Sequence, residues 1–280
     1  MVIFKEIEPL KAFLDGKRAQ GLSIGLVPTM GALHSGHLEL IKASKKANST
    51  TVCSIFVNPT QFNNPTDLEK YPRTAEQDIA ALESVGCDVL FHPAREIMYQ
   101  KPSNLKFDFG ALDKILEGQF RPGHFSGVAL VVSKLFNIVN PNRAYFGQKD
   151  FQQFKIVSQL AEELNYNIEL ICFPTLREPD GLAMSSRNLR LNKAERQTAL
   201  VLQRALNFAK TELKKGIDLK SIKAKVREMC DKETNVKLEY FELANTENLN
   251  LIDDVKQADQ SILLIAGFVG EIRLIDNMFV

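Results

Sequence analysis

The chain has 280 residues, of which 45% are hydrophobic and 25% are charged, a composition typical of a globular protein with one large domain and a small one. Because 35 basic residues are nearly balanced by 34 acidic ones, the sequence does not predict the broad positive surface of a nucleic-acid-binding protein. No apolar run is long enough to cross a membrane and the N-terminal residues lack the apolar segment of a signal peptide, so we expect a cytoplasmic protein.

Strand-like and helix-like segments alternate over the first 173 residues. Strands are predicted at 22–27, 51–57, 88–91, 143–146 and 168–173, and helices at 9–20, 36–48, 74–85, 126–139 and 151–164. Apolar strands interleaved with helices predict a parallel sheet that is covered on both faces. Ligands bind such sheets at the carboxyl ends of the strands, near a switch in strand order, so functional residues are expected there.

The pattern changes after residue 193. Two helices, at 193–215 and 219–233, precede a strand at 237–243 and an apolar region at 261–275. Gly267 and Gly270 interrupt this last region, which predicts a hairpin. The C-terminal part is therefore expected to be a small α+β domain with antiparallel strands.

The four cysteines form no Cys-x-x-Cys pair. They are Cys53, Cys87, Cys172 and Cys230, and they lie far apart in the sequence. Cys53 and Cys172 fall within apolar runs, so we expect small buried side chains in a reducing compartment.

Residues 22–37, LSIGLVPTMGALHSGH, predict a strand, a tight turn and a helix start. A helix start offers unpaired N–H groups and partial positive charge, which suit a phosphate group. Gly31 and Gly36 lack side chains that would hold a ligand away, and Ser35 is a candidate helix cap. His34 and His37 are three residues apart, so one helical turn should direct both imidazoles to a common point.

Two other interpretations of this histidine pair remain open. Both residues could be structural, or they could be half of a zinc site. Zinc requires three or four ligands, and no Cys or Glu lies at a suitable spacing. An anion-binding helix start agrees better with the whole stretch.

The motif His-Ser-Gly-His resembles the HxGH signature of the nucleotidyltransferases related to class I aminoacyl-tRNA synthetases. The longer string PTMGALHSGH, residues 28–37, resembles the pantothenate synthetases, the pantoate–β-alanine ligases, more closely. The resemblance implies an α/β fold with a Rossmann-like parallel sheet, in residues 1–176, that binds ATP and pantoate. It also implies a small C-terminal α+β lid domain in residues 177–280.

The activity that the resemblance implies is an AMP-forming ligation in coenzyme A biosynthesis. ATP would activate (R)-pantoate as pantoyl adenylate with loss of diphosphate, and β-alanine would then give pantothenate and AMP. Two alternatives are a nucleotidyltransferase that acts on a phosphate ester and a nucleotide-binding regulatory protein without turnover. The amide-rich acceptor loops and the density of charged and hydroxyl groups at strand ends favour the ligase.

Amide side chains are candidates for pantoate and β-alanine binding because an amide offers donors and an acceptor without charge. Gln61 lies in the loop after the second strand, and by resemblance it binds pantoate, with Asn58 in a supporting role. Gln153 corresponds to a second pantoate-binding amide. Arg121, in the string EGQFRPGHFSG, is expected near the substrate acid group, whereas His124 in the same string is interpreted as a capping or packing residue.

Magnesium is the expected cofactor, with ATP as the substrate. Asp78 is the candidate metal ligand, in the helix that follows the string YPRT. Some relatives have a second acid where this chain has Gln77, so the phosphates of ATP would supply most of the ligands.

Two further motifs are expected to contact ATP. The string GQKD, residues 147–150, follows a strand and offers Lys149 to phosphate oxygens, although the family usually has Glu in place of Gln148. The string MSSR, residues 184–187, resembles the mobile KMSKS loop and offers two hydroxyls and a guanidinium. The catalytic residues are then expected to be His34, His37, Lys149 and Arg187.

The expected ATP-binding set is Met30, Gly31, Ala32, Leu33, His34, Ser35, Gly36, His37, Gly147, Gln148, Lys149, Asp150, Leu176, Met184, Ser185, Ser186 and Arg187. The expected small-molecule partners are ATP, pantoate and β-alanine. A second copy of the chain is also expected, in a homodimer to whose interface residues 51–57 contribute. No nucleic acid or membrane partner is expected.

Overall fold

The computed structural model describes residues 1–63, 65–101, 103–257 and 259–280. The chain forms two compact units. The first contains Met1–Gly147 and Gln153–Phe173, and the second contains Gln148–Gln152 and Pro174–Val280. This division differs from the expected boundary after residue 176 in two places. The second unit begins at Pro174, and it also includes the short segment from Gln148 to Gln152.

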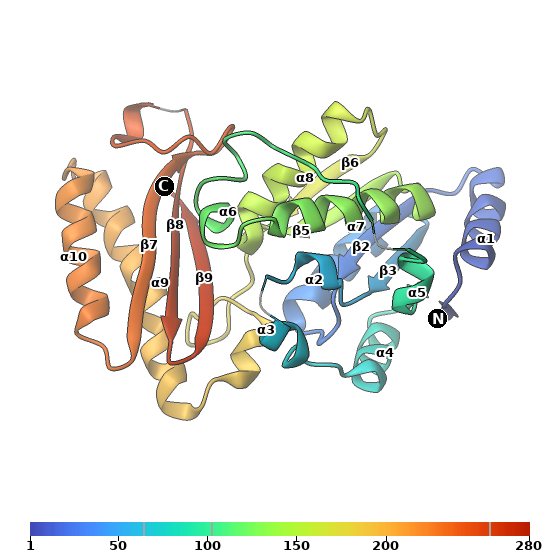
Figure 1. The fold of residues 1–280 in the computed structure, drawn as a ribbon, viewed down its shortest axis with the longest axis horizontal. Helices are drawn as coiled ribbons and strands as arrows, with labels where there is room; N and C mark the ends of the chain where they lie inside the picture. Colours follow the sequence, from blue (N-terminus) through green and yellow to red (C-terminus); the bar gives the residue numbers. More distant parts are fainter. Residues whose placement is uncertain (64, 102, 258) are drawn as a thin grey trace. The chain divides into compact units, whose positions relative to one another are not determined.

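The first unit is built on a six-stranded parallel sheet (Figure 1). Its strands are β1 (Val2–Phe4), β2 (Ile24–Thr29), β3 (Thr50–Ile55), β4 (Val89–Phe91), β5 (Arg143–Gly147) and β6 (Glu169–Phe173). Their spatial order is β1-β4-β3-β2-β5-β6, so the chain returns past β2 to place β5 on its other side. The switch in strand order therefore lies between β2 and β5, and the expected Rossmann-like sheet is confirmed.

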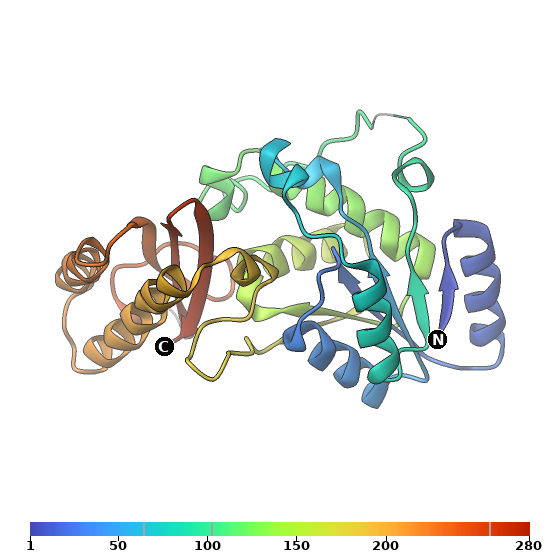
Figure 2. The same ribbon diagram turned by 90° about the horizontal axis from the view of Figure 1, so that it is seen from below.

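Helices cover both faces of this sheet (Figure 2). The long ones are α1 (Ile7–Ala19), α2 (Ser35–Ala47), α4 (Ala75–Ser84), α7 (His124–Val139) and α8 (Phe151–Glu163), and the short ones are η1 (Pro59–Gln61), α3 (Pro65–Glu69), α5 (Arg95–Met98) and α6 (Glu117–Phe120). One buried cluster joins α1, α7 and α8 to sheet residues such as Leu26 and Val52. A second joins α2 and α4 to Val27 and Cys53, the next residues along the same strands. Successive strand residues point to opposite faces, which explains the two cores.

Five of the six strands agree with the sequence prediction to within about two residues at most boundaries. The strand that the sequence analysis missed is β1, at the edge of the sheet beside β4. Val2 and Ile3 are 45% and 41% exposed, so this strand lacks the apolar run of a strand buried on both faces.

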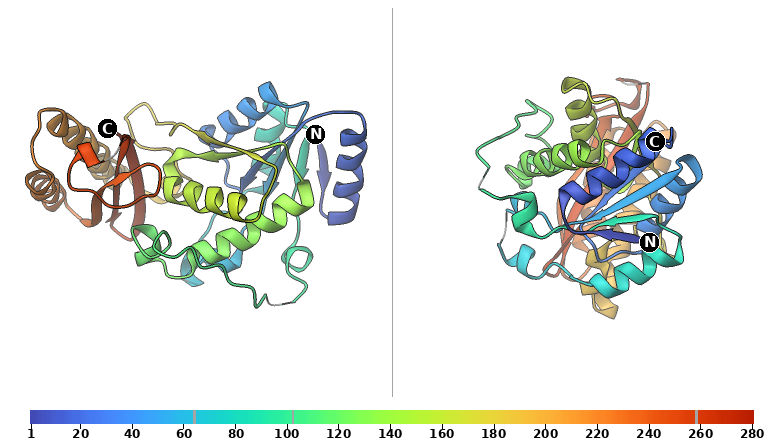
Figure 3. Two further views of the ribbon diagram at one scale, coloured as in Figure 1. Left: turned by 90° about the horizontal axis from the view of Figure 1, so that it is seen from above. Right: turned by 90° about the vertical axis from the view of Figure 1, so that its right-hand side faces the viewer.

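The second unit contains a three-stranded antiparallel sheet with two long helices (Figure 3). Its elements are η2 (Gln148–Asp150), η3 (Ser186–Arg190), α9 (Lys193–Lys214), α10 (Leu219–Asp231), β7 (Val236–Asn245), η4 (Val255–Gln257), β8 (Ser261–Val269) and β9 (Ile272–Phe279). A core of its own joins α9 and α10 to the sheet. The expected α+β architecture is confirmed. The expected break at Gly267 is wrong, because this residue pairs within β8 and the turn is at Gly270.

Strand β3, which contains most of residues 51–57, offers no free backbone edge to the suggested dimer interface. Strand β3 lies inside the sheet, between β4 and β2, and all six of its residues are buried. Residues 52–54 pair with both neighbouring strands, so their backbone groups cannot pair with a second chain. The homodimer itself stays a prediction.

Of the two cysteines expected to be buried, Cys53 is confirmed and Cys172 is not. Cys53, Cys87 and Cys230 are buried, whereas Cys172 is only half-buried. Burial raises the pKa of the Cys87, Cys172 and Cys230 thiols to about 11. Over the described part of the chain, none of the helices combines the length and apolar character that a membrane crossing needs.

Candidate active site

The loop after β2 has an unusual backbone conformation, which the buried carboxylate of Asp78 stabilises. Gly31 and Ala32 both have positive φ, at 80° and 49°. Asp78 on α4 accepts hydrogen bonds from this loop with both of its oxygens, from Ala32 N at 3.0 Å and from Leu33 N at 2.7 Å. A Cβ atom on Gly31 would lie 3.0 Å from Asp78 Oδ2, so glycine is needed here for both its φ and its size.

Asp78, the candidate metal ligand, is buried beside the loop after β2, and its role toward a metal stays a prediction. Its side chain is 3% exposed and both oxygens already accept backbone hydrogen bonds, whereas the neighbouring Gln77 is exposed. In the described ranges, no three His, Cys, Asp or Glu side chains are grouped closely enough to hold a metal ion. A single acid would leave the phosphates of ATP to supply most of the ligands of a magnesium ion, as the sequence analysis expected.

The two histidines lie together at the start of α2, as the sequence predicted. Their ring centroids are 4.0 Å apart. His34 is the N-cap residue, so the expected capping role of Ser35 is wrong, because Ser35 is the first residue of the helix. Nδ1 of His37 accepts from the backbone N–H of His34 at 3.3 Å. A neutral ring that accepts at Nδ1 carries its proton on Nε2, so this bond makes Nε2 of His37 a hydrogen-bond donor.

The buried side chain of Asn58 forms hydrogen bonds to several other residues. It is 1% exposed. Its Nδ2 donates to Gln61 Oε1 at 3.2 Å and to Gly127 O at 3.1 Å, and its Oδ1 accepts from the Tyr99 hydroxyl at 2.9 Å. These bonds support a role for Asn58 in positioning Gln61. The Gln61 side chain also donates to Met30 Sδ at 2.8 Å, which connects the loops after β2 and β3.

A second contact that holds Gln61 comes from α7, and the sequence analysis missed it. His124 is 5% exposed, and its Nδ1 lies 2.7 Å from the carbonyl oxygen of Gln61. Its Nε2 lies 3.1 Å from Arg121 Nη1, so the guanidinium donates at Nε2 and the ring donates from Nδ1. Arg121 therefore contacts His124, and its guanidinium also lies 3.8 Å from Glu117. The only sequence signal for this arrangement was the short spacing between Arg121 and His124.

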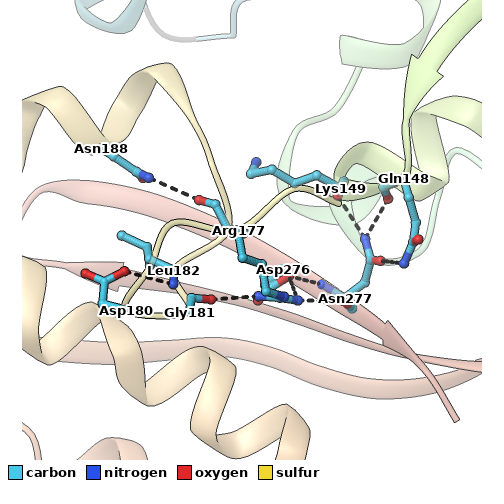
Figure 4. A network of polar contacts seen from close by, with 10 residues as sticks. Gln148, Lys149, Arg177, Asp180, Gly181, Leu182, Asn188, Asp276 and Asn277 are labelled. Atoms are coloured by element: carbon cyan, nitrogen blue, oxygen red, sulfur yellow. Dashed lines mark hydrogen bonds and ion pairs between the residues drawn. The ribbon is translucent and has the colours of Figure 1, made fainter. Parts of the chain in front are cut away.

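In the second unit, the segment that carries Lys149 is fixed by the C-terminal strand (Figure 4). Asn277 on β9 donates to the carbonyl oxygens of Gln148 and Lys149 at 2.8 and 2.9 Å. The Gln148 amide donates to Asn277 Oδ1 at 3.0 Å. Gln148 therefore serves as a donor in this network. Asp150 is exposed at the end of the same segment.

The loop that carries the second ATP motif begins as a small hairpin. Arg177 and Ala183 form an antiparallel bridge, and Met184 N donates to Leu176 O at 3.0 Å. Asp276 on β9 binds Arg177 through both carboxylate oxygens, at 2.7 and 3.0 Å. After the hairpin, Ser185 Oγ accepts from Arg187 N at 3.3 Å and begins η3.

An ion-pair network joins this hairpin to α9. Arg196 donates to Glu178 at 2.7 Å and to Asp180 at 2.8 Å. The hydrogen bond from Arg196 lowers the pKa of the Glu178 carboxyl below its ordinary value of 4.5. Asn188 adds a bond to Glu178 at 2.9 Å, which connects η3 to the hairpin.

A small pocket in the second unit is lined by two of the expected ATP-binding residues. Lys149, Ser185 and Asn188 line it together with Ala183 and Asp276. Ser186 is 8% exposed, and Arg187 and Met184 are half-buried. The expected set is divided between the units: the first contains Met30 to His37, Gln61, Arg121 and Gln153, and the second contains Gln148 to Asp150 and 184–187.

Comparisons with known proteins agree over the whole chain. A family model described as pantoate-beta-alanine ligase matches residues 2–279. The pantothenate synthetase of Caldicellulosiruptor bescii is 46% identical over 281 residues, covering 100% of this chain and 99% of that protein. The pantothenate synthetase of Aquifex aeolicus is 47% identical over 278 residues, covering 99% and 98% of the two chains.

Solved structures give the same result. The pantothenate synthetase of Thermus thermophilus superimposes with a TM-score of 0.92 at 38% identity, covering 99% of both chains. A pantoate-beta-alanine ligase from Francisella tularensis, solved with beta-gamma ATP and beta-alanine, gives a TM-score of 0.82 at 36% identity, covering 99% of this chain and 97% of that one. On these matches, which extend from the first strand to the last, the chain belongs to the pantoate-beta-alanine ligase family.

Proposed function

We propose that this chain condenses (R)-pantoate with β-alanine in two steps, through pantoyl adenylate. In the first step a carboxylate oxygen of pantoate attacks the α-phosphorus of ATP, and diphosphate leaves. In the second step the amine of β-alanine attacks the acyl carbon, and AMP leaves with the oxygen that came from pantoate. The family match carries this proposal, and the paired imidazoles at the start of α2 are the geometry that supports it best.

The first unit supplies donors and amides in this proposal. The Nε2 proton of His37, with the His34 ring beside it, would stabilise charge that develops on the phosphates, because fixed donors stabilise a transition state at little reorganisation cost. Gln61 would bind pantoate, and the contacts from Asn58 and His124 support this because they fix its side chain and its backbone. Gln153, half-buried on α8, would bind pantoate as well.

The second unit supplies cationic and hydroxyl groups to ATP. Lys149, Ser185 and Arg187 are proposed to bind its phosphates, and Leu176 and Met184 its nucleoside. Charge stabilisation of this kind is the main catalytic contribution in phosphoryl and nucleotidyl transfer. Magnesium would enter bound to the phosphates of ATP. The Asp78 carboxylate already accepts two hydrogen bonds from the loop after β2, so it would supply few of the ligands of the ion.

An isotope experiment tests the adenylate. With pantoate labelled by ¹⁸O in its carboxylate, one labelled oxygen should appear in AMP, and diphosphate should form with pantoate and ATP alone. Formation of ADP instead of AMP, or AMP without label, would show that another intermediate is used. Absence of any pantoate-dependent product would favour one of the alternative nucleotide-binding functions.

Two substitutions test the proposed charge stabilisation. His37→Ala and Lys149→Ala should each slow diphosphate release in a single turnover by at least about 100-fold, the usual effect of removing a preorganised donor. His92→Ala, at a histidine beside the end of β4, and the exposed Lys220→Ala are the matched controls. They should release diphosphate at close to the unsubstituted rate, and equal losses in controls and test variants would contradict the assignment.

A further inference from the structure

Asn277 is a buried amide whose hydrogen-bonding groups are directed at one short segment of the chain. Its side chain is 2% exposed. Nδ2 donates to the carbonyl oxygens of Gln148 and Lys149, and Oδ1 accepts from the Gln148 side chain. The three bonds together fix the amide's orientation and hold the backbone from which the Lys149 side chain extends (Figure 4).

The preceding residue, Asp276, holds a different segment in a similar way. Its carboxylate is 5% exposed and forms a two-bond pair with Arg177, whose Nη1 also donates to Gly181 O at 3.1 Å. Asp276 Oδ1 in addition accepts from the backbone N–H of Asn277 at 2.8 Å. The paired guanidinium and carboxylate planes give this contact a defined geometry.

Two consecutive residues of β9 therefore fix the two segments that present Lys149 and Ser185. Both of these side chains line the pocket that Asp276 also lines. Segment 148–150 is a single short 3₁₀ turn, and such a turn has few internal hydrogen bonds to maintain its conformation. The turn joins β5 directly to α8, and Asn277 adds three side-chain hydrogen bonds that fix its conformation.

We propose that Asn277 is a positioning residue for Lys149, acting through the backbone of residues 148 and 149, and that Asp276 fixes the adjoining hairpin relative to it. Neither residue contacts ATP in this proposal, which rests on the proposed role of Lys149 in adenylate formation. A displacement of about 1 Å in a catalytic group can cost about 100-fold in rate, so loss of these contacts should be visible in the chemical step.

A double-mutant cycle separates positioning from a general effect on folding. Asn277→Ala should slow single-turnover diphosphate release by about 30- to 100-fold in the otherwise unchanged chain. In a Lys149→Ala background the same substitution should cost less than about 3-fold, because the group that it misplaces is already absent. Asn277→Ser, which keeps one donor, should give an intermediate loss and provides a second variant if Asn277→Ala folds poorly.

Asn245→Ala is the matched control, because Asn245 ends strand β7 of the same sheet and its side chain accepts only a local bond from Glu247 N in the described contacts. It should leave the rate within about 2-fold. Amide hydrogen exchange provides a readout that does not depend on activity. Exchange in residues 148–150 should become at least about tenfold faster in Asn277→Ala and should be unchanged in Asn245→Ala.

The outcomes distinguish this proposal from the function on which it rests. Equal fold-losses for Asn277→Ala with and without Lys149, or unchanged exchange in residues 148–150, would overturn the positioning role alone. An undiminished rate in Lys149→Ala would remove the proposed role of Lys149, and the positioning proposal with it. A large loss that disappears in the Lys149→Ala background, together with faster exchange, supports both.

Discussion

At the scale of single residues, Asp78 shows how a buried carboxylate can stabilise the backbone of a loop. It binds the backbone of Ala32 and Leu33, and the first of these has positive φ without being glycine. A non-glycine residue in this conformation is strained and persists only when its surroundings hold it there. The two bonds to a charged acceptor provide that stabilisation, and the loop leads directly into His34 and His37.

Replacement of Asp78 by Asn tests this interpretation. The asparagine side chain keeps one acceptor oxygen, but its NH₂ group would face one of the two loop N–H groups, and two donors cannot form a hydrogen bond. The free energy of unfolding should therefore fall by about 1.5–3 kcal/mol. Exchange of the amides in residues 31–33 should increase, and diphosphate release should slow. The measurements are chemical denaturation, hydrogen exchange and single-turnover kinetics.

Glu76→Gln is the control, because Glu76 is an exposed acid in the first turn of the same helix. It should leave loop exchange unchanged. If Asp78 instead bound magnesium, high magnesium concentrations would restore the activity of Asp78→Asn. Such a rescue, with unchanged exchange in the loop, would contradict the loop-holding role.

At the scale of elements, ion pairs connect hairpin 176–184 to α9, in addition to the buried Leu182 side chain. Arg196, in the first turns of that helix, contacts both Glu178 and Asp180. These side chains are partly exposed, so the individual pairs should be weak, but Arg196 is shared between two carboxylates and Glu178 also binds Asn188. The network should therefore contribute more to the free energy of unfolding than an isolated surface ion pair does.

The lowered pKa of Glu178 gives this contribution a defined pH dependence. Because its folded-state pKa lies below the ordinary value of 4.5, the stabilisation is fully present above that pH and is lost as the pH falls through the lowered value. Glu178→Gln should therefore reduce the free energy of unfolding at pH 7, and the difference from the unsubstituted chain should shrink below about pH 4.5.

Denaturation curves between pH 7 and pH 3 provide the measurement. The exposed Glu247→Gln is the control and should change the free energy of unfolding by no more than about 0.5 kcal/mol throughout. If the free energy of unfolding of Glu178→Gln differed from that of the unsubstituted chain by the same amount down to pH 3, the effect would not come from the ionised carboxylate.

At the scale of the whole molecule, the two units have separate hydrophobic cores. Leu26 belongs to a core of the first unit and Leu206 to that of the second, and both are fully buried. Replacement of either by Ala should destabilise its own unit by about 2–5 kcal/mol through lost burial and a cavity. Separate cores should permit separate local unfolding.

Hydrogen exchange on the matched pair Leu26→Ala and Leu206→Ala tests this separation. Leu206→Ala should lower protection in α9 and in the three-stranded sheet, with protection of β2 and β3 unchanged. Leu26→Ala should give the reverse pattern. A similar loss of protection in both units from either substitution would show that the chain unfolds as one cooperative unit.

The sequence by itself determined the features that depend on neighbouring residues. Apolar runs and helical periodicity predicted five of the parallel strands and all five long helices of the first unit, because burial on both faces requires continuous apolar segments. The spacing of His34 and His37 predicted that they would meet, because the first turn of a helix places such residues on one face. The motifs in residues 28–37 and 147–150 pointed to the family in the same local way.

Only the tertiary structure decided the contacts between distant segments. Asn277 binds a segment 129 positions earlier, and Asp78 binds a loop 45 and 46 positions earlier. Nothing local distinguishes these residues from other polar side chains in a strand or in the first turn of a helix. Their roles arise when folding buries them beside unpaired backbone groups, because a buried polar group must find a partner wherever the fold places one.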